Sequence, residues 1–429
     1  MCARQALLDG VSSVTAAIVT PLLKEIRYSP LLWLLAVVPV VLTAQILDPE
    51  AHTLLFLLSI AAIVPLAALL SRATESVAAK TGDMIGGLLN ATLGNLTELL
   101  IALAALRAGQ YVLVKASIAG AIVTNALFML GISFLVGGLK HHVQEYNRVS
   151  ARVQAGLLFL AMVALLIPSA VAQADSAAAS AFTHKLSVGL AVLLIVAYGL
   201  GMLFSLKTHR ELFVSAEHAE ADTGATAAAF TQVLSMGLSV LLIGIYALGL
   251  LFSLSTHREF FVSLDHAEPD EAQWTLGLAL STLAGVTVLV ALVSEIFVES
   301  VQQAAIVLGI APAFVGFIIV ALVGGAAEMV SALSAARKNR LDLSVGIALG
   351  SASQIALFVA PVLVLASYIV GPMPMNLQFW PGAVAMMLIG TMVASLVTNT
   401  GRSAWFVGAL VSIVYVIFAM TLYLLPPRN

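Results

Sequence analysis

Apolar runs of about twenty residues constrain this chain more strongly than any other feature of its sequence. A helix needs about 20 mostly apolar residues to cross the hydrocarbon core of a bilayer, and such runs recur throughout the 429 residues. Charged residues make up only 10% of the chain, whereas soluble domains carry roughly 25%. This composition excludes a soluble enzyme, a disordered protein and a nucleic-acid binder with a basic face. We therefore expect an all-α polytopic protein in a lipid bilayer.

Polar breaks divide the apolar runs into two halves separated by an acidic stretch. The division predicts an N-terminal cytoplasmic segment (1–29), a first transmembrane half (30–206), an acidic linker (207–274) and a second transmembrane half (275–425). The single cysteine, Cys2, excludes an internal disulfide and a Cys-rich metal site. The spans are expected near residues 30–47, 53–71, 84–106, 113–137, 153–172, 186–206, 234–254, 275–298, 305–335, 343–370, 379–398 and 403–425.

Two copies of one segment flank the middle of the chain. Residues 186–220 read LSVGLAVLLIVAYGLGMLFSLKTHRELFVSAEHAE, and residues 234–268 read LSMGLSVLLIGIYALGLLFSLSTHREFFVSLDHAE. The two copies are more similar in sequence than ancient repeats are, so we interpret the pair as a recent local duplication. The duplication adds one extra hydrophobic segment, 234–254, inside the acidic linker.

A second repeat is weaker and spans the two halves. Residues 94–107 read GNLTELLIALAALR and residues 324–337 read GGAAEMVSALSAAR, so that Glu98 corresponds to Glu328. Secondary transporters are commonly built from such repeats, with the binding site where interrupted helices meet. A carboxylate at a helix centre costs about 2.5–3.5 kcal/mol on insertion scales, and it therefore indicates a functional site.

Oxygen-bearing groups accompany the two acids. Asn90, Gly94 and Glu98 have the spacing of one helix face, and no histidine or cysteine converges on them. Such surroundings favour hard cations such as Ca²⁺, Mg²⁺ or Na⁺. The residues expected around Glu98 and Glu328 are Asn90, Gly94, Asn95, Asn125, Gly324, Gly325, Ser351 and Gln354.

Two membrane carboxylates suggest a mechanism. Desolvation and mutual repulsion disfavour the doubly ionised pair, so two protons or one divalent cation are the stable occupants. Competition between them is what proton-coupled antiport requires. The alternative is that both acids are structural groups satisfied by hydrogen bonds. Three further acids, Glu75, Glu295 and Glu299, lie near span ends, where a solvated position and a role in a cation or proton path are both open.

The chain resembles the calcium/proton exchangers of the cation/proton exchanger type, in the calcium/cation antiporter superfamily. The resemblance rests on GGLLNATLGNLTELLIALAALRAGQ (86–110), ASIAGAIVTNALFMLGISFLVGG (116–138) and GGAAEMVSALSAARKNRLDLSVGIALGSASQIALFVAPVLV (324–364). It implies 11 spans, formed by an N-terminal helix and two inverted five-helix repeats. It also implies that Glu98, Glu328 and Asn95 coordinate the cation.

The second repeat departs from the family pattern, which usually reads Gly-Asn-Ala-Ala-Glu-His. Gly325 replaces the asparagine and Met329 replaces the histidine. One side-chain ligand and one titratable neighbour are therefore missing from this half. The change makes a monovalent specificity more credible than it is for the family pattern.

The extra hydrophobic segment bears on the membrane topology. In inverted halves, matching helices cross the membrane in opposite directions, so their positions in the order of spans must differ by an odd number. That difference becomes even if both copies of the duplicated segment cross the membrane. With one copy crossing and the N-terminus inside, most of the 19 Lys and Arg residues fall on the inner side, as the positive-inside rule requires. We therefore expect only one copy to span.

These observations predict a cation/proton antiporter that exports Ca²⁺ in exchange for H⁺. The alternatives are a Na⁺ or K⁺/H⁺ antiporter and a passive ion channel. An enzyme is not expected because no HExxH motif or pair of membrane aspartates is present, and no organic cofactor is expected. Short loops and the lack of a cleavable signal or organellar targeting segment suggest a bacterial inner membrane. The sequence leaves homo-oligomerisation open.

Overall fold

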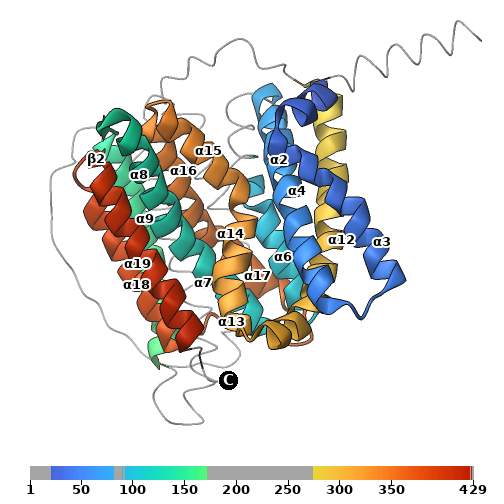
Figure 1. Cartoon of the computed structure of the whole chain (residues 1–429). Helices are drawn as coiled ribbons and strands as arrows, with labels where there is room; N and C mark the ends of the chain where they lie inside the picture. Colours follow the sequence, from blue (N-terminus) through green and yellow to red (C-terminus); the bar gives the residue numbers. More distant parts are fainter. Residues whose placement is uncertain (1–20, 82–88, 90–91, 172–273, 426, 428–429) are drawn as a thin grey trace, which may run out of the picture.

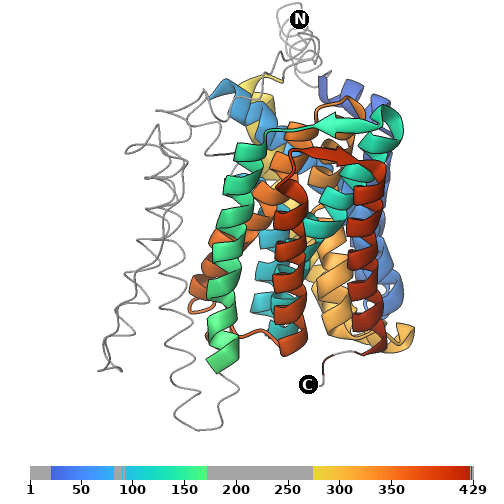
Figure 2. The ribbon, with the colours of Figure 1, turned by 90° about the vertical axis from the view of Figure 1, so that its left-hand side faces the viewer.

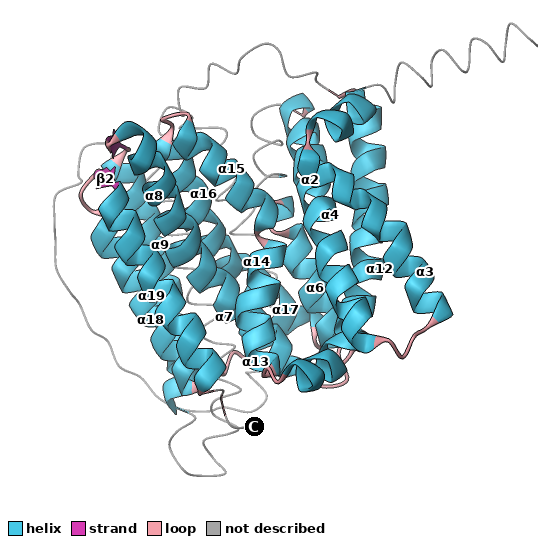
Figure 3. Ribbon diagram, viewed as in Figure 1, coloured by secondary structure: helices cyan, strands magenta, loops and turns pink. Residues whose placement is uncertain are grey.

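The computed structural model describes residues 21–81, 89, 92–171, 274–425 and 427. Within these ranges the chain is helical except for short connections and one two-stranded sheet (Figure 3). Seven described helices are long and apolar enough to cross a membrane, or eight if the bent pair Pro312–Gly324 and Ala326–Arg337 is counted as one span. The chain is therefore a multi-pass integral membrane protein, as its composition predicts.

Several predicted features fall outside the described residues. They are Asn90, the extra hydrophobic segment 234–254 and all of the acidic linker except Trp274. The predicted total of 11 spans includes segments in these ranges, so it stays a prediction.

The described elements of the first half form a series of helices followed by a short strand and one more helix (Figure 1). The long helix α4 contains Pro65. The elements are α2 (Pro30–Trp33), η1 (Leu34–Ala36), α3 (Val37–Leu47), α4 (His52–Lys80), α6 (Leu96–Arg107), α7 (Tyr111–Val123), η2 (Thr124–Met129), α8 (Leu130–His141), β1 (Val143–Glu145) and α9 (Arg148–Val171).

The second half repeats much of this order. In the described part of the chain, η2, η5 and η6 are π-helices, whereas η1 is a 3₁₀-helix. The elements are α12 (Leu276–Leu308), α13 (Pro312–Phe314), η5 (Val315–Val320), α14 (Ala321–Gly324), α15 (Ala326–Arg337), α16 (Leu341–Gln354), η6 (Ile355–Val359), α17 (Ala360–Ala366), α18 (Pro381–Thr398), β2 (Arg402–Ala404) and α19 (Trp405–Leu424).

Basic residues gather at one end of the bundle, which we call the basic end. Strands β1 and β2 pair there in antiparallel register, and Arg402 forms a 2.7 Å ion pair with Glu145. Lys140 Nζ donates a 2.9 Å hydrogen bond to the carbonyl of Arg337, at the C-terminal end of α15. Figures 1 and 2 place the C-terminal part of α4 at the same end. By the positive-inside rule, we expect the basic end to face the cytoplasm.

A connection between α17 and α18 covers the opposite end. Tyr111, at the start of α7, donates a 2.5 Å hydrogen bond from its hydroxyl to the Met373 carbonyl. Lys115 Nζ donates a 2.6 Å hydrogen bond to Asn376 Oδ1. The backbone N–H of Phe379 donates to Ser169 Oγ on α9 at 2.9 Å. The end of α6, the start of α7 and the end of α9 therefore lie together, away from the basic end.

These contacts fix the direction of the helices that carry the repeat. Helix α6 ends at the opposite end, whereas α15 ends at the basic end. The continuous segment from α7 to α8 runs from the opposite end to the basic end. The segment from α16 to α17 runs the other way, because Asp342 at its start accepts a hydrogen bond from the Asn147 N–H and α17 leads into the connection at the opposite end.

Close helix crossings depend on glycine. A Cβ atom placed on Gly120 of α7 would lie 2.1 Å from the Phe317 carbonyl oxygen of η5. A Cβ atom on Gly408 of α19 would lie 2.2 Å from the Leu135 nitrogen of α8. Only a residue without a side chain fits at such crossings, which small residues allow in membrane bundles.

Three of the predicted helix boundaries are wrong. The span predicted to end at residue 71 continues as α4 to Lys80. The span predicted to end at residue 298 continues as α12 to Leu308, where Gly309 ends the helix with φ +67° in the left-handed region. The segment predicted as one span over 305–335 begins at Pro312 and bends by 56° at Gly325. The predicted helix face of Asn90, Gly94 and Glu98 includes Asn90, which lies outside the described residues; of the other two, Gly94 lies in a turn and Glu98 in α6, which begins after Asn95.

Candidate cation-binding site

Glu98 and Glu328 each lie in the first turn of a helix that begins where the chain breaks its helical path. Helix α6 begins directly after Asn95, and α15 begins directly after Gly325. Each glutamate is the third residue of its helix, and both are withdrawn from solvent, Glu98 with 8% of its surface exposed and Glu328 half-buried. The two halves therefore present their acids in the same local setting.

Glu98 reaches across to the helix break of the second half. A Cβ atom on Gly324 would lie 2.9 Å from Glu98 Cγ. A Cβ atom on Gly325 would lie 3.6 Å from Glu98 Oε1 and 3.5 Å from Asn125 Oδ1. Glycine at these two positions therefore lets the Glu98 carboxyl and the Asn125 amide approach the break from the first half.

Three buried polar atoms of Glu98 and Asn125 have no hydrogen-bond partner in the described part of the chain. Glu98 Oε2 and both amide atoms of Asn125 are buried and form no hydrogen bond with any described residue. Buried polar atoms without a partner are rare, because each carries the full cost of its desolvation. Glu98 Oε2 and Asn125 Oδ1 are thus free to bind a cation, and the Glu98 carboxylate can instead take up a proton.

Asn95 links the first half to α16 in the second. Its position before α6 is one from which asparagine often caps a helix, but its side chain makes no such bond. Instead, Asn95 Nδ2 donates a 2.7 Å hydrogen bond to Gln354 Oε1, and Asn95 Oδ1 accepts a 2.7 Å hydrogen bond from Ser351 Oγ. Ser351 Oγ also contacts Glu328 Oε2. The side chains form one chain of contacts in the order Glu328, Ser351, Asn95 and Gln354.

The hydrogen bonds along these four side chains depend on whether Glu328 carries a proton. The hydroxyl of Ser351 has one proton to donate, yet it contacts two acceptors, Asn95 Oδ1 and Glu328 Oε2. When it donates to Asn95, the contact with Glu328 is a hydrogen bond only if the Glu328 carboxyl carries a proton. Every contact in the chain is then satisfied. The geometry therefore suits a protonated Glu328.

The chemistry of the site is that of oxygen ligands. The part of the chain that the structure describes contains no group of three or more His, Cys, Asp or Glu residues that could hold a metal ion. Two carboxyls, three amide groups and a hydroxyl gather at and beside the breaks instead. Their charges matter as well, since Glu98 and Glu328 repel each other when both are ionised. A hard cation or protons can relieve that repulsion.

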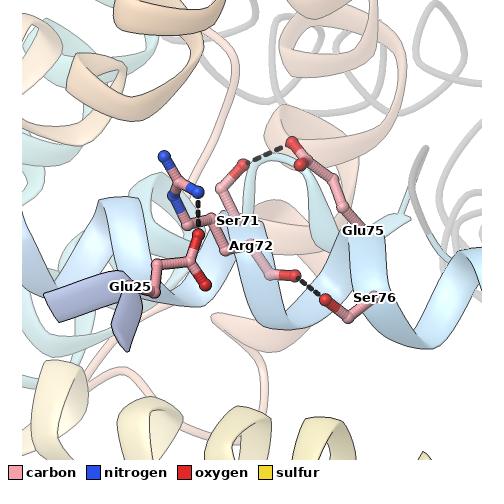
Figure 4. Close-up of polar contacts among 5 residues, drawn as sticks. All are labelled: Glu25, Ser71, Arg72, Glu75 and Ser76. Carbon is pink, nitrogen blue, oxygen red and sulfur yellow. Dashed lines mark hydrogen bonds and ion pairs between the residues drawn. The ribbon is translucent and has the colours of Figure 1, made fainter. Parts of the chain in front are cut away.

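The other three acids lie away from this site. Glu75 is an exposed residue near the basic end of α4, where it accepts a 3.2 Å hydrogen bond from Ser71 Oγ. Figure 4 shows it one turn from Arg72, which pairs with Glu25 of the N-terminal region. This setting matches a surface role at the basic end.

Glu295 and Glu299 are also separate from Glu98 and Glu328. Both are exposed on α12. Glu295 forms a 2.8 Å ion pair with Arg107, the last residue of α6, and Glu299 accepts a 3.3 Å hydrogen bond from Gln45 of α3. They tie neighbouring helices together near the opposite end.

One residue beside the site carries no sequence signal. Tyr415 of α19 is buried, and its hydroxyl lies 3.1 Å from Thr124 Oγ1, next to Asn125. Nothing in the apolar run 403–425 distinguishes it from a membrane-facing tyrosine, because the contact depends on how α19 packs. Only the structure reveals it.

Comparison with known proteins places these features in context. Residues 51–207 and 278–424 match the family model described as sodium/calcium exchanger protein. The chain is similar to a Ca(2+)/H(+) antiporter of Aphanothece halophytica, with 35% identity over 87% of this chain and 90% of the relative. It is also similar to the Ca(2+)/H(+) antiporter ChaA of Bacillus subtilis (strain 168), with 35% identity over 86% and 92% of the two chains.

Solved structures resemble the fold. The structure of native YfkE matches with a TM-score of 0.68 and 32% identity, covering 91% of this chain and 98% of that one. The crystal structure of an H+/Ca2+ exchanger, CAX, matches with a TM-score of 0.58 over 92% of this chain and 88% of that one. Its 16% identity supports the fold alone.

Proposed function

Because the chain belongs to the sodium/calcium exchanger protein family, we propose that it is a Ca²⁺/H⁺ antiporter. The relatives named above are Ca²⁺/H⁺ antiporters and are aligned over most of their length. The observation that carries the proposal within this chain is the meeting of Glu98 and Glu328 at two helix breaks lined by oxygen donors. Transport, rather than an enzymatic reaction, is the activity of this family.

The helix directions support two inverted repeats. Helix α6 and the segment that follows it run opposite to α15 and its following segment. The bounds of α6 (96–107) correspond to those of α15 (326–337), and the start of α7 at residue 111 corresponds to the start of α16 at residue 341. We therefore retain the predicted halves, 30–206 and 275–425. Helix α9 ends at the opposite end and α12 begins at the basic end (Figure 1), which supports the expectation that only one copy of the duplicated segment crosses.

Exchange follows from competition for the same oxygens. Ca²⁺ takes six to eight oxygen ligands, and Glu98, Asn125, Glu328 and Asn95 supply several from the protein. In the protonated state, the Glu328 carboxyl donates to Ser351, and every hydrogen bond from Glu328 through Ser351 and Asn95 to Gln354 is formed. Entry of Ca²⁺ displaces the protons, and return of protons releases Ca²⁺. In a bacterial plasma membrane with the basic end in the cytoplasm, proton entry would export Ca²⁺.

A monovalent antiporter is the second candidate, and Gly325 is the observation that favours it. The resemblance leads us to expect an asparagine there, and a side chain at that position would start 3.5 Å from Asn125 Oδ1 and 3.6 Å from Glu98 Oε1. Its absence removes one ligand from the site. Fewer ligands weaken the distinction between Ca²⁺ and Na⁺.

Transport by purified protein tests the proposal directly. In liposomes with an imposed pH gradient and a pH-sensitive dye, Ca²⁺ is expected to drive proton movement, because the two compete for Glu98 and Glu328. The same assay with Na⁺ or K⁺ should give no response. A response to Na⁺ or K⁺ alone would select the second candidate, and no response to any ion would refute antiport.

Ser351→Ala is expected to lower the exchange rate by about tenfold. The substitution leaves Asn95 Oδ1 and Glu328 Oε2 without their shared partner, and an unpaired buried polar group costs about 1–3 kcal/mol. Initial rates of Ca²⁺-driven proton movement measure the effect. Ser353→Ala is the matched control, since the Ser353 hydroxyl donates to backbone carbonyls away from Glu328 and Asn95, that of Leu349 at 2.8 Å and that of Gln154 at 3.4 Å. Equal rates in the two variants would contradict a role for the chain of contacts.

A further inference from the structure

A buried tyrosine from the last helix contacts the turn that carries Asn125. Tyr415 of α19 is 4% exposed, and its hydroxyl and Thr124 Oγ1 form a 3.1 Å hydrogen bond. The Tyr415 ring also packs on Phe128, with the ring centroids 5.0 Å apart. Both Thr124 and Phe128 belong to the π-helix η2. Tyr415 therefore holds this turn by a polar contact at its start and an apolar contact one turn later.

Helix α19 packs closely against α8, and this packing places Tyr415 beside η2. A Cβ atom on Gly131 would lie 2.9 Å from the Ser412 nitrogen, and one on Gly138 would lie 2.2 Å from the Trp405 nitrogen. A Cβ atom on Gly408 would lie 2.5 Å from the Gly131 carbonyl oxygen. The two backbones thus touch at several levels along α19. Tyr415 therefore projects from a helix whose backbone is in close contact with α8.

Asn125 depends on its backbone for its orientation. It is 1% exposed, and neither amide atom bonds to any residue that the structure describes. Side chains of this kind are usually fixed by their own hydrogen bonds. Here the wider turn of η2 determines where the amide points, and π-helical turns are frequent at functional sites. Whatever holds the turn also holds the amide.

We propose that Tyr415 is a positioning residue for cation binding, which fixes η2 through Thr124 so that the Asn125 amide oxygen faces Glu98. The inference rests on the proposed exchange function. Tyr415 does not bind the cation itself; it contacts Thr124 and Phe128 of η2, the element that carries Asn125. Its hydroxyl acts on affinity, since a looser η2 spreads the Asn125 oxygen over several positions.

Tyr415→Phe tests the proposal because it removes the hydroxyl and keeps the ring against Phe128. The KM for Ca²⁺ is expected to rise about three- to tenfold, the effect of one typical hydrogen bond, with kcat within about twofold of the wild type. The Ca²⁺ concentration that raises the melting temperature should increase by the same factor. Tyr423→Phe is the control, because Tyr423 lies on the same helix and is 55% exposed.

Thr124→Val provides the second arm. If the hydrogen bond is the cause, Thr124→Val should raise KM like Tyr415→Phe, and the double variant should be no worse than either single one. An unchanged KM in Tyr415→Phe, or additive effects in the double variant, would overturn the proposal. A lower melting temperature without a change in KM would also overturn it, since that is a purely structural role. Exchange by the wild type, measured alongside, separates these outcomes from failure of the proposed function.

Discussion

Glu98→Gln and Glu328→Gln are each expected to lower Ca²⁺-driven proton exchange by at least about 100-fold. Glutamine keeps the size of the side chain but removes the charge and the exchangeable proton. Two unit charges 4 Å apart interact by about 4 kcal/mol at the effective dielectric typical of proteins, and 1.4 kcal/mol corresponds to a factor of ten. Loss of one carboxylate beside a divalent cation therefore reduces binding severely.

The measurement is the initial rate of proton movement in liposomes, with protein incorporation checked by quantitative blotting. Both variants should fold, because each amide can replace the carboxyl in a polar setting. Glu145→Gln is the control, since Glu145 lies at the basic end in a surface ion pair with Arg402, and such pairs contribute about 0–1 kcal/mol. Exchange near the wild-type rate in either membrane variant would refute the paired site.

Gly120→Ala is expected to have the largest effect on stability. The added methyl group would lie 2.1 Å from the carbonyl oxygen and 2.4 Å from the Cα atom of Phe317. Backbone atoms cannot rotate away as a side chain can, so α7 and η5 must separate. Overpacking of this kind typically costs about 1–3 kcal/mol and occasionally more, and we expect a fall of about 5 °C or more in the melting temperature in detergent.

Gly285→Ala is the matched control for that change. Gly285 lies inside α12, is exposed, and has no described atom within 4 Å of the position of an added Cβ. Alanine is also the better helix former, by about 1 kcal/mol. Its melting temperature should equal or exceed that of the wild type. A Gly120→Ala protein as stable as the Gly285→Ala protein would show that the crossing tolerates a wider separation.

The sequence predicts much of this site for a physical reason. A carboxylate is expensive in hydrocarbon, so Glu98 and Glu328 stand out in their apolar surroundings. The repeat around them aligns the two helices, and the bounds 96–107 and 326–337 keep that alignment. The spacing places Asn95 three residues before Glu98, and the family resemblance implies that it coordinates the cation; in the structure it lies next to Ser351 and Gln354.

Packing could not be predicted in the same way. Gly120 and Gly350 are separated by the same 230 positions as Glu98 and Glu328. A Cβ atom on Gly120 would nevertheless meet Phe317 closely, whereas one on Gly350 would have no described atom within 4 Å outside its own helix backbone. Tyr415 contacts Thr124 because α19 docks on α8, and that docking depends on residues far apart in the chain. The extent of α12 was also missed, since polar Gln302 and Gln303 interrupt its apolar pattern without ending the helix.

The two helix breaks have a consequence for the release of the cation. The N-termini of α6 and α15 both begin at the site, and each helix N-terminus carries roughly half a positive elementary charge from its aligned peptide dipoles. Ionised Glu98 and Glu328 outweigh these dipoles and make the site attractive to Ca²⁺. Once both carboxyls are protonated, the negative charge that offsets these two N-termini is gone. Protons therefore do more than occupy the ligand oxygens, because their arrival also removes the charge that attracts a cation to the site.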